Sequence, residues 1–183
     1  MTIKEEDLDK RFGDLWKKGP GYELTIKDAL EYALLKSDNT AYHVLLSTYP
    51  SFLDEVFDFL DLPKDSQDNE PVVTPKNYAS IFRSLYLSAY LKPEYSENIL
   101  DLLTRTEFAD RIQAGVPSNI SVAHKIGVLK NKQTYSDCGI IFYPDRPYTL
   151  CVMVESETEK EAFEIMKNTS QIVFSYIDSA KSF

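Results

Sequence analysis

Apolar residues recur three and four positions apart over much of the first two thirds of the chain, a pattern typical of amphipathic helices. The clearest example begins at Thr25, which is followed at the third position by Asp28, as in residues that cap a helix N-terminus. Its apolar face consists of Ile26, Ala29, Leu30, Ala33 and Leu34. The pattern therefore predicts a helix that starts at Thr25 and leads into residues 37–39.

The same periodicity returns in further short segments joined by short links. They cover residues 39–49, 51–60, 74–91, 93–106 and 107–115. Ser51 is expected to cap the second of these helices. Thr74 and Pro75 should open the third, since proline lacks the N–H that a first helical turn leaves unpaired. Residues 61–73 are polar, contain two prolines and are expected to form a loop.

After Pro117 the pattern changes to that of strands. Runs rich in apolar and β-branched residues cover positions 121–129, 135–143 and 148–155. The linking residues 144–147 include Asp145 and Pro147 and suggest a hairpin, so three consecutive antiparallel strands are predicted. The chain ends with an amphipathic pattern over residues 157–180, a predicted long helix. Its expected core-facing residues are Ala162, Ile165, Met166, Ile172, Val173 and Ile177.

This order of elements predicts an α+β fold, because the helices and strands are segregated along the chain. We expect a helical cluster over about residues 22–116, followed by a three-stranded antiparallel sheet and a C-terminal helix over about residues 118–181. Residues 1–183 would form a single domain. Three strands are few for a domain of this size, so we expect an uncovered sheet edge.

Composition narrows the classes of function. The net charge of −9 argues against a nucleic-acid partner, because binding to phosphates requires clustered Lys and Arg. No apolar run approaches the length of a membrane span. With two histidines and two cysteines in the whole chain, and none at ligand spacing, we expect no metal or other cofactor. Cys138 and Cys151 lie in apolar runs and are expected to be buried free thiols.

Two short motifs point to chemistry. Ser37-Asp38-Asn39 lies at the junction of two predicted helices, and Lys125-Ile126-Gly127 lies in the first predicted strand. Alone, each motif is common, since an S-D-N tripeptide often only caps a helix and a strand lysine usually faces solvent. Penicillin-recognising serine enzymes, however, carry S-x-x-K, S-D-N and K-T-G in this order. The presence of both the S-D-N and the Lys-x-Gly motif in this order favours a catalytic site.

The stretch ELTIKDALEYALLKSDNTAYHVLL and the strand region that starts VAHKIGVL resemble the class A β-lactamase and penicillin-binding family over nearly the whole chain. The resemblance implies a β-lactamase or transpeptidase-like fold. Ser37 would pass a proton to the leaving nitrogen, and Asn39 would hold the substrate amide. Lys125 would supply positive charge near the nucleophile and the substrate carboxylate. Gly127 would let the substrate lie against the strand, with an oxyanion-binding N–H near Leu129.

The chain departs from the family pattern in three places. No serine is followed by Lys at the third position, so S-x-x-K is absent, and we expect a truncated member that lacks the N-terminal nucleophile segment. The family's deacylating Glu has no matching motif in residues 61–73, where Glu70 is the sole glutamate. Ile126 replaces the usual Thr, whose hydroxyl binds the substrate carboxylate. His124 could compensate as a substrate-binding residue, or it could be a strand-surface histidine.

Three interpretations remain open. In the first, the chain is an incomplete serine hydrolase for β-lactams or peptidoglycan-type peptides and is inactive alone. In the second, it is a non-catalytic binding or interaction module on a degenerate penicillin-binding fold. In the third, Ser136 or Ser118 has become the nucleophile, although neither has a Lys or His at an activating spacing. Whether the chain is an enzyme is therefore undecided by its sequence.

The family also implies partners and a location. β-Lactams or peptidoglycan-type peptides would be the ligands. The exposed sheet edge at residues 148–155 would allow self-association or pairing with a missing N-terminal segment. The family implies an extracytoplasmic location, whereas the polar, acidic start of the chain is not a signal peptide.

Overall fold

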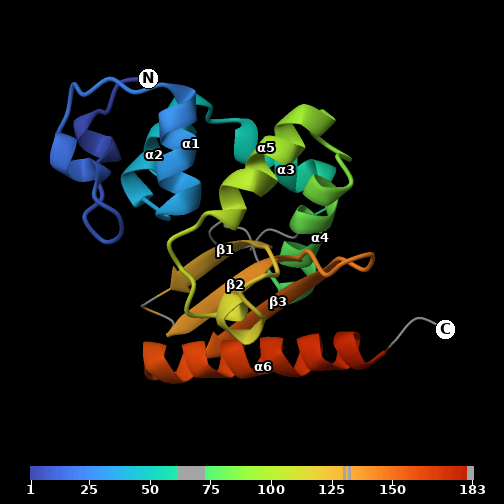
Figure 1. The fold of residues 1–183 in the computed structure, drawn as a ribbon. Helices are drawn as coiled ribbons and strands as arrows, with labels where there is room; N and C mark the ends of the chain where they lie inside the picture. Colours follow the sequence, from blue (N-terminus) through green and yellow to red (C-terminus); the bar gives the residue numbers. More distant parts are fainter. Residues whose placement is uncertain (62–72, 130, 132, 181–183) are drawn as a thin grey trace. The chain divides into compact units, whose positions relative to one another are not determined.

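The computed structural model describes residues 1–61, 73–129, 131 and 133–180 (Figure 1). The chain divides into two compact units, Met1–Val73 and Thr74–Phe183. The loop predicted at residues 61–73, and Glu70 with it, lies almost entirely outside the described residues.

The first unit is built from short helices. Its elements are η1 (Glu5–Asp7), η2 (Leu15–Lys18), α1 (Ile26–Leu35), α2 (Asn39–Thr48) and α3 (Phe52–Phe59). They enclose a small core of Ile3, Leu15, Leu24, Ala29, Ala41 and Val44. The three predicted α-helices are confirmed. Thr25 caps α1 as expected, because its hydroxyl accepts from the Asp28 N–H at 3.1 Å.

The second unit combines helices with the sheet. Its elements are α4 (Pro75–Tyr86), α5 (Pro93–Thr104), η3 (Ile112–Gly115), β1 (Val122–Leu129), β2 (Thr134–Ile141), β3 (Tyr148–Glu155) and α6 (Glu159–Ser179). The strands form an antiparallel sheet in the order β1-β2-β3, as predicted. α6 lies along one face of the sheet, and α4 contacts β2 and β3 (Figure 1).

The two faces of the sheet have different neighbours. The face with even-numbered β1 residues packs on η3 and α6, and its core includes Ile112, Val122, Ile141, Ala162 and Met166. The other face carries Lys125, Cys138 and Cys151 in one cross-strand row, since Lys125 pairs with Cys138 and Cys138 with Cys151. Side chains directly opposite each other in a sheet share a face.

Two helix predictions need correction. Residues 107–115 do not form an α-helix but end in the single 3-10 turn η3. The turn is fixed from outside, because the buried carboxylate of Asp137 accepts from the Ile112 N–H at 3.2 Å. α4 ends at Tyr86 rather than near residue 91, and Ser88 follows with a positive φ of 51° that no helix accommodates.

The predicted inner face of the last helix is correct only in part. Ala162 and Met166 are fully buried. Ile165 and Ile172, also predicted to face the core, are 41% and 71% exposed. Ile165 and Ile172 are seven positions apart and lie on one side of the helix, beside the side that buries Ala162 and Met166.

The expectation of free thiols was wrong. Cys138 and Cys151 form a disulfide between β2 and β3. The sequence could not show that they stand directly opposite each other, with Cα atoms 4.1 Å apart, because this depends on the register of the hairpin. Among the described residues no free cysteine remains.

Candidate active site

The S-D-N tripeptide forms a tight turn between α1 and α2. Ser37 is half-buried and takes a positive φ of 54°, a conformation that costs a non-glycine residue energy. The Asp38 N–H turns back to donate to the carbonyl of Tyr32 at 3.1 Å. The serine that the sequence singled out is therefore held in an uncommon backbone conformation by the residues around it.

Asp38 anchors this turn. Its buried carboxylate caps α2 by accepting from the Ala41 N–H at 3.0 Å. The other oxygen accepts from the N–H groups of Asp14 and Leu15 at 2.7 and 2.8 Å. Gly13 makes this approach feasible, since a Cβ there would lie 2.1 Å from the carboxylate. One aspartate thus ties the turn to the segment before η2.

Asn39 begins α2 beside a second polar cluster. Its N–H donates to the carbonyl of Phe12 at 3.2 Å. The carboxylate of nearby Asp9 accepts from the Arg11 Nε–H at 2.9 Å. The bond from Arg11, and further bonds that include one from Asn39, hold the pKa of Asp9 well below its usual range. Asp9 is therefore an ionised structural group and not a proton donor at neutral pH.

Lys125 lies in β1 on the disulfide face. Its Nζ donates to the Ile126 carbonyl at 3.0 Å. Burial, together with the positive charge of Arg111, lowers the pKa of Lys125 to about 8, although the charge of Asp137 acts in the opposite direction. The lysine thus sits where its protonated form is less stable than in water, and a nearby carboxylate would stabilise that form.

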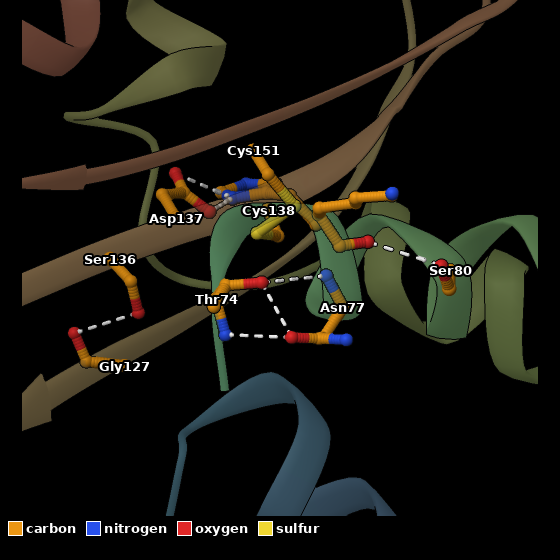
Figure 2. Close-up of a disulfide and its surroundings, with 10 residues drawn as sticks. Thr74, Asn77, Ser80, Gly127, Ser136, Asp137, Cys138 and Cys151 are labelled. Atoms are coloured by element: carbon orange, nitrogen blue, oxygen red, sulfur yellow. Dashed lines mark hydrogen bonds and ion pairs between the residues drawn. A yellow bond between two sulfur atoms is a disulfide. The ribbon is translucent and has the colours of Figure 1, made fainter. Parts of the chain in front are cut away.

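Gly127 and Ser136 pair across β1 and β2 on the same face as Lys125. The Ser136 hydroxyl donates to the Gly127 carbonyl at 3.4 Å, and a Cβ at position 127 would lie 2.6 Å from that hydroxyl. Figure 2 shows this pair next to the disulfide and the first turn of α4. Gly127 therefore leaves room for the serine side chain on this face.

The backbone register decides which N–H groups of β1 are open. In antiparallel sheets, residues alternate between pointing their N–H and C=O groups toward and away from a given neighbour. The Phe142 N–H donates to the Ser121 carbonyl, so odd-numbered residues of β1 point toward β2. The N–H of Leu129 thus faces Thr134, and that of Val128 faces the side where no described strand pairs.

His124 lies on the opposite face of β1 and is fully buried. Its Nδ1 is 2.9 Å from Oδ1 of Asp137, and its Nε2 is 3.1 Å from Oε1 of Gln113. Asp137 also accepts from the Ile112 N–H, as described above. This buried pair joins β1, β2 and η3, so a direct contact of His124 with a substrate would require the ring to leave both partners.

The sequence did not identify Asp38, Asp137 and Arg111 as residues that surround and hold the candidate site residues. Asp38 was visible as part of the S-D-N motif. No sequence pattern marks Asp137 or Arg111, because the residues that they contact come from distant parts of the chain. The Arg111 guanidinium is buried and stacks 3.9 Å from the ring centre of Phe163.

Other kinds of site find no support in the residues that the structure describes. Among them, no group of three or more His, Cys, Asp and Glu side chains is placed to hold a metal ion. In the same residues, no helix is both long and apolar enough to cross a bilayer.

An anchored S-D-N turn between helices, and a Lys-x-Gly segment on a strand of an antiparallel sheet, are features of the penicillin-recognising serine hydrolases. The chain belongs to the β-lactamase enzyme family, whose sequence profile matches residues 1–177. No curated protein sequence matches the chain.

Solved structures agree on the fold. The structure of PBP-A superposes with a TM-score of 0.85 at 18% identity, covering 98% of this chain and 71% of that one. A mutant of PBP-A, solved as an acyl-enzyme complex with penicillin G, gives the same values. The class A β-lactamase of the last common ancestor of Gram-negative bacteria gives 0.83 at 24% identity, covering 97% and 74%. At these identities the likeness establishes a β-lactamase fold and nothing finer.

Proposed function

We propose that this chain carries the proton-transfer and substrate-recognition groups of a β-lactamase-type serine hydrolase, and that by itself it binds its ligands without forming an acyl-enzyme. Ser37 is the proposed proton shuttle, and Asn39 the proposed partner of the substrate amide. The observation that carries the proposal is the S-D-N turn. Its serine is held at φ 54°, and its aspartate fixes three backbone N–H groups.

Lys125 is the proposed charge for the ligand carboxylate. The low pKa of Lys125 supports this role. Burial makes its protonated form less stable, and an anionic ligand would offset that loss of hydration. Ile126 cannot add the hydroxyl that the family normally places beside it. Recognition of the carboxylate therefore depends on this lysine more than in a relative with Thr at that position.

The proposed oxyanion donor shifts by one residue from the sequence-based expectation. Leu129 was expected, but its N–H faces β2, whereas the N–H of Val128 faces the open side of β1. We assign the role to Val128. Gly127 keeps its proposed role of letting a flat substrate approach the strand, and His124 becomes a residue that supports β1 from its other face.

The missing step is nucleophilic attack. No S-x-x-K occurs in the 183 residues, so this chain lacks the motif whose serine a proton shuttle at Ser37 would serve. Ser136 is an unsuitable substitute, because its hydroxyl is directed at the Gly127 carbonyl rather than at a base. Acyl transfer would need a serine supplied from outside these residues.

The family implies β-lactams as ligands, and peptidoglycan-type peptides ending in D-Ala-D-Ala are the proposed natural counterpart. A second function, a binding module without turnover, is favoured by Ile126 in place of Thr. The two functions differ in what a complementing S-x-x-K segment would do. It would restore turnover in the first and change nothing in the second.

Titration calorimetry with benzylpenicillin tests the recognition role. The chain should bind it reversibly, and Lys125→Met should weaken binding at least about tenfold, as expected for the loss of a charge-assisted hydrogen bond. Lys160→Met, an exposed lysine in the first turn of α6, is the matched control and should bind like the wild type. Equal affinities for the two variants, or no binding by the wild type at millimolar ligand, would refute the proposal.

A further inference from the structure

Asp9 lies at the centre of a polar cluster beside the S-D-N turn. Its ionised carboxylate is only 7% exposed, and such burial requires hydrogen bonds and an opposite charge that offset the lost hydration. The Arg11 side chain supplies both, because its Nε–H donates to the two carboxylate oxygens at 3.1 and 2.9 Å. The backbone N–H of Arg11 donates to Oδ1 at 2.7 Å. Together these bonds fix the orientation of the carboxylate.

Backbone and hydroxyl contacts hold the same segment against the start of α2. The Asp9 N–H donates to the Thr40 hydroxyl at 2.9 Å, and that hydroxyl donates to the Asp9 carbonyl at 3.2 Å. Thr40 is fully buried, so water does not compete for these bonds. Three residues further on, the Phe12 carbonyl accepts from the Asn39 N–H. The Asp9 carboxylate therefore has a fixed position relative to the first turn of α2.

Two side chains of α2 face this carboxylate. Asn39 and His43 are four positions apart, so they lie one turn apart on the same side of the helix. The side chain of Asn39 donates a hydrogen bond to the carboxylate of Asp9, and Nε2 of His43 is 3.4 Å from its Oδ2. Asp9 is thus in direct contact with the residue that we propose as the partner of the substrate amide.

The charge of Asp9 decides which way the Asn39 carboxamide points. An ionised carboxylate only accepts hydrogen bonds, so the atom of Asn39 that faces Asp9 must be Nδ2 and not Oδ1. The contact with Asp9 uses one N–H of Nδ2, and it leaves Oδ1 and the second N–H to face elsewhere. A secondary amide in a ligand has one N–H and one carbonyl oxygen, which match this acceptor and this donor.

We propose that Asp9 is a positioning residue that fixes the Asn39 carboxamide and thereby favours ligands that carry a secondary amide. The inference rests on the proposed function of Asn39 and adds the residue that sets its orientation. A side chain that is ordered before binding loses less conformational entropy when the ligand arrives, so the fixed orientation favours affinity as well as selectivity. Arg11 contributes indirectly, because it holds the carboxylate of Asp9 in place.

Titration calorimetry with two ligands tests this role. Benzylpenicillin has a secondary amide in its acylamino side chain, whereas aminopenicillanic acid has the same fused rings and carboxylate without that amide. Asp9→Asn keeps the shape of the side chain, but its carboxamide both donates and accepts, so Asn39 is free to turn either way. We expect Asp9→Asn to lower the affinity for benzylpenicillin about fivefold, as for the loss of one hydrogen bond, and to leave that for aminopenicillanic acid unchanged.

Asp7→Asn is the matched control. Asp7 is a second buried aspartate of the same segment, 2% exposed, and its carboxylate accepts from the Lys4 N–H at 2.9 Å. Its replacement should leave both affinities as in the wild type. In an Asn39→Ala background, Asp9→Asn should change neither affinity. A loss that is equal for the two ligands, that Asp7→Asn reproduces, or that persists without Asn39 would show a merely structural role and overturn the proposal.

A second variant keeps the proposal testable if Asp9→Asn does not fold. The Arg11 side chain is 80% exposed, so Arg11→Gln should fold, as circular dichroism would show. The variant removes the charge that holds the Asp9 carboxylate. It should therefore lower the affinity for benzylpenicillin alone, by a smaller factor than Asp9→Asn. An Arg11→Gln variant that weakens both ligands equally would contradict the proposal.

Nuclear magnetic resonance of the ligand-free chain separates this inference from the proposed function. If the wild type binds neither ligand, the proposed recognition role fails, but the orientation of Asn39 remains measurable. The side-chain amide signals of Asn39 in an isotope-labelled chain should shift and exchange faster with water in Asp9→Asn, and should stay unchanged in Asp7→Asn. Asn39 signals that Asp9→Asn leaves in place would overturn the inference, whatever the ligands do.

Discussion

At the scale of single residues, two residues of the proposed site are held in states that their residue types seldom adopt. Ser37 has a backbone conformation that serine seldom adopts, and Lys125 carries its charge where burial disfavours it. Strain and desolvation of this kind are tolerated at functional sites, provided that neighbouring contacts enforce them. For Ser37 the enforcing residue is Asp38.

Replacing Asp38 should therefore be costly. Asp38→Ala leaves the N–H groups of Asp14, Leu15 and Ala41 without their acceptor, and we expect the free energy of unfolding to fall by about 3 kcal/mol. Urea denaturation measures this change. Asp58→Ala, at an exposed position of α3, should stay within about 0.5 kcal/mol of the wild type. Similar small effects for both variants would show that Asp38 does not anchor the turn.

Lys125 predicts a pH dependence of stability with a defined sign. Its pKa is about 8 in the folded chain, against an ordinary value of 10.5. Between these pH values the unfolded chain binds more protons, so the contribution of Lys125 to the free energy of unfolding rises with pH. Lys125→Met removes the cost of the buried charge and should stabilise the chain at pH 7 by about 1–3 kcal/mol.

The measurement is the difference in unfolding free energy between wild type and Lys125→Met at several pH values. This difference should be largest below pH 8 and shrink toward pH 10. A variant that is less stable than the wild type at pH 7 would contradict the low pKa. The same variant is expected to lose affinity for penicillin, which would be a trade of stability for binding.

At the scale of elements, periodicity located the helices and strands well because capping residues and turns agreed with it. Thr25 and Thr74 both mark helix starts that the structure contains. Two of the failures share one cause. The turn at residues 112–115 and the bond between Cys138 and Cys151 depend on partners that are brought together by sheet register, which local patterns do not encode.

The disulfide between β2 and β3 allows the register of this hairpin to be tested. Cys138 and Cys151 are separated by 13 positions, and closing a loop of this size stabilises a protein by about 3 kcal/mol. Dithiothreitol should lower the wild-type stability by about that amount and leave the double variant Cys138→Ala, Cys151→Ala unchanged. Alkylation of the denatured, unreduced chain by iodoacetamide at both cysteines would contradict the bond.

At the scale of the whole molecule, two tripeptides and their order along the chain predicted the family. They could do so because acyl transfer from a β-lactam requires particular side chains on particular elements. The sequence could not assign the open N–H to Val128, nor place His124 on the buried face with Asp137, since both follow from strand pairing. The sequence therefore located the motifs well, but it predicted the surroundings of single groups, such as the Leu129 N–H and the His124 side chain, less accurately.

The central claim is that this chain holds the recognition and proton-transfer groups of its family without a nucleophile. Intact-mass spectrometry after incubation with benzylpenicillin tests it most directly. The account predicts an unchanged mass, even at ligand concentrations that saturate reversible binding. A stoichiometric adduct that survives denaturation would contradict it, and peptide mapping would then show which residue of the chain had been acylated.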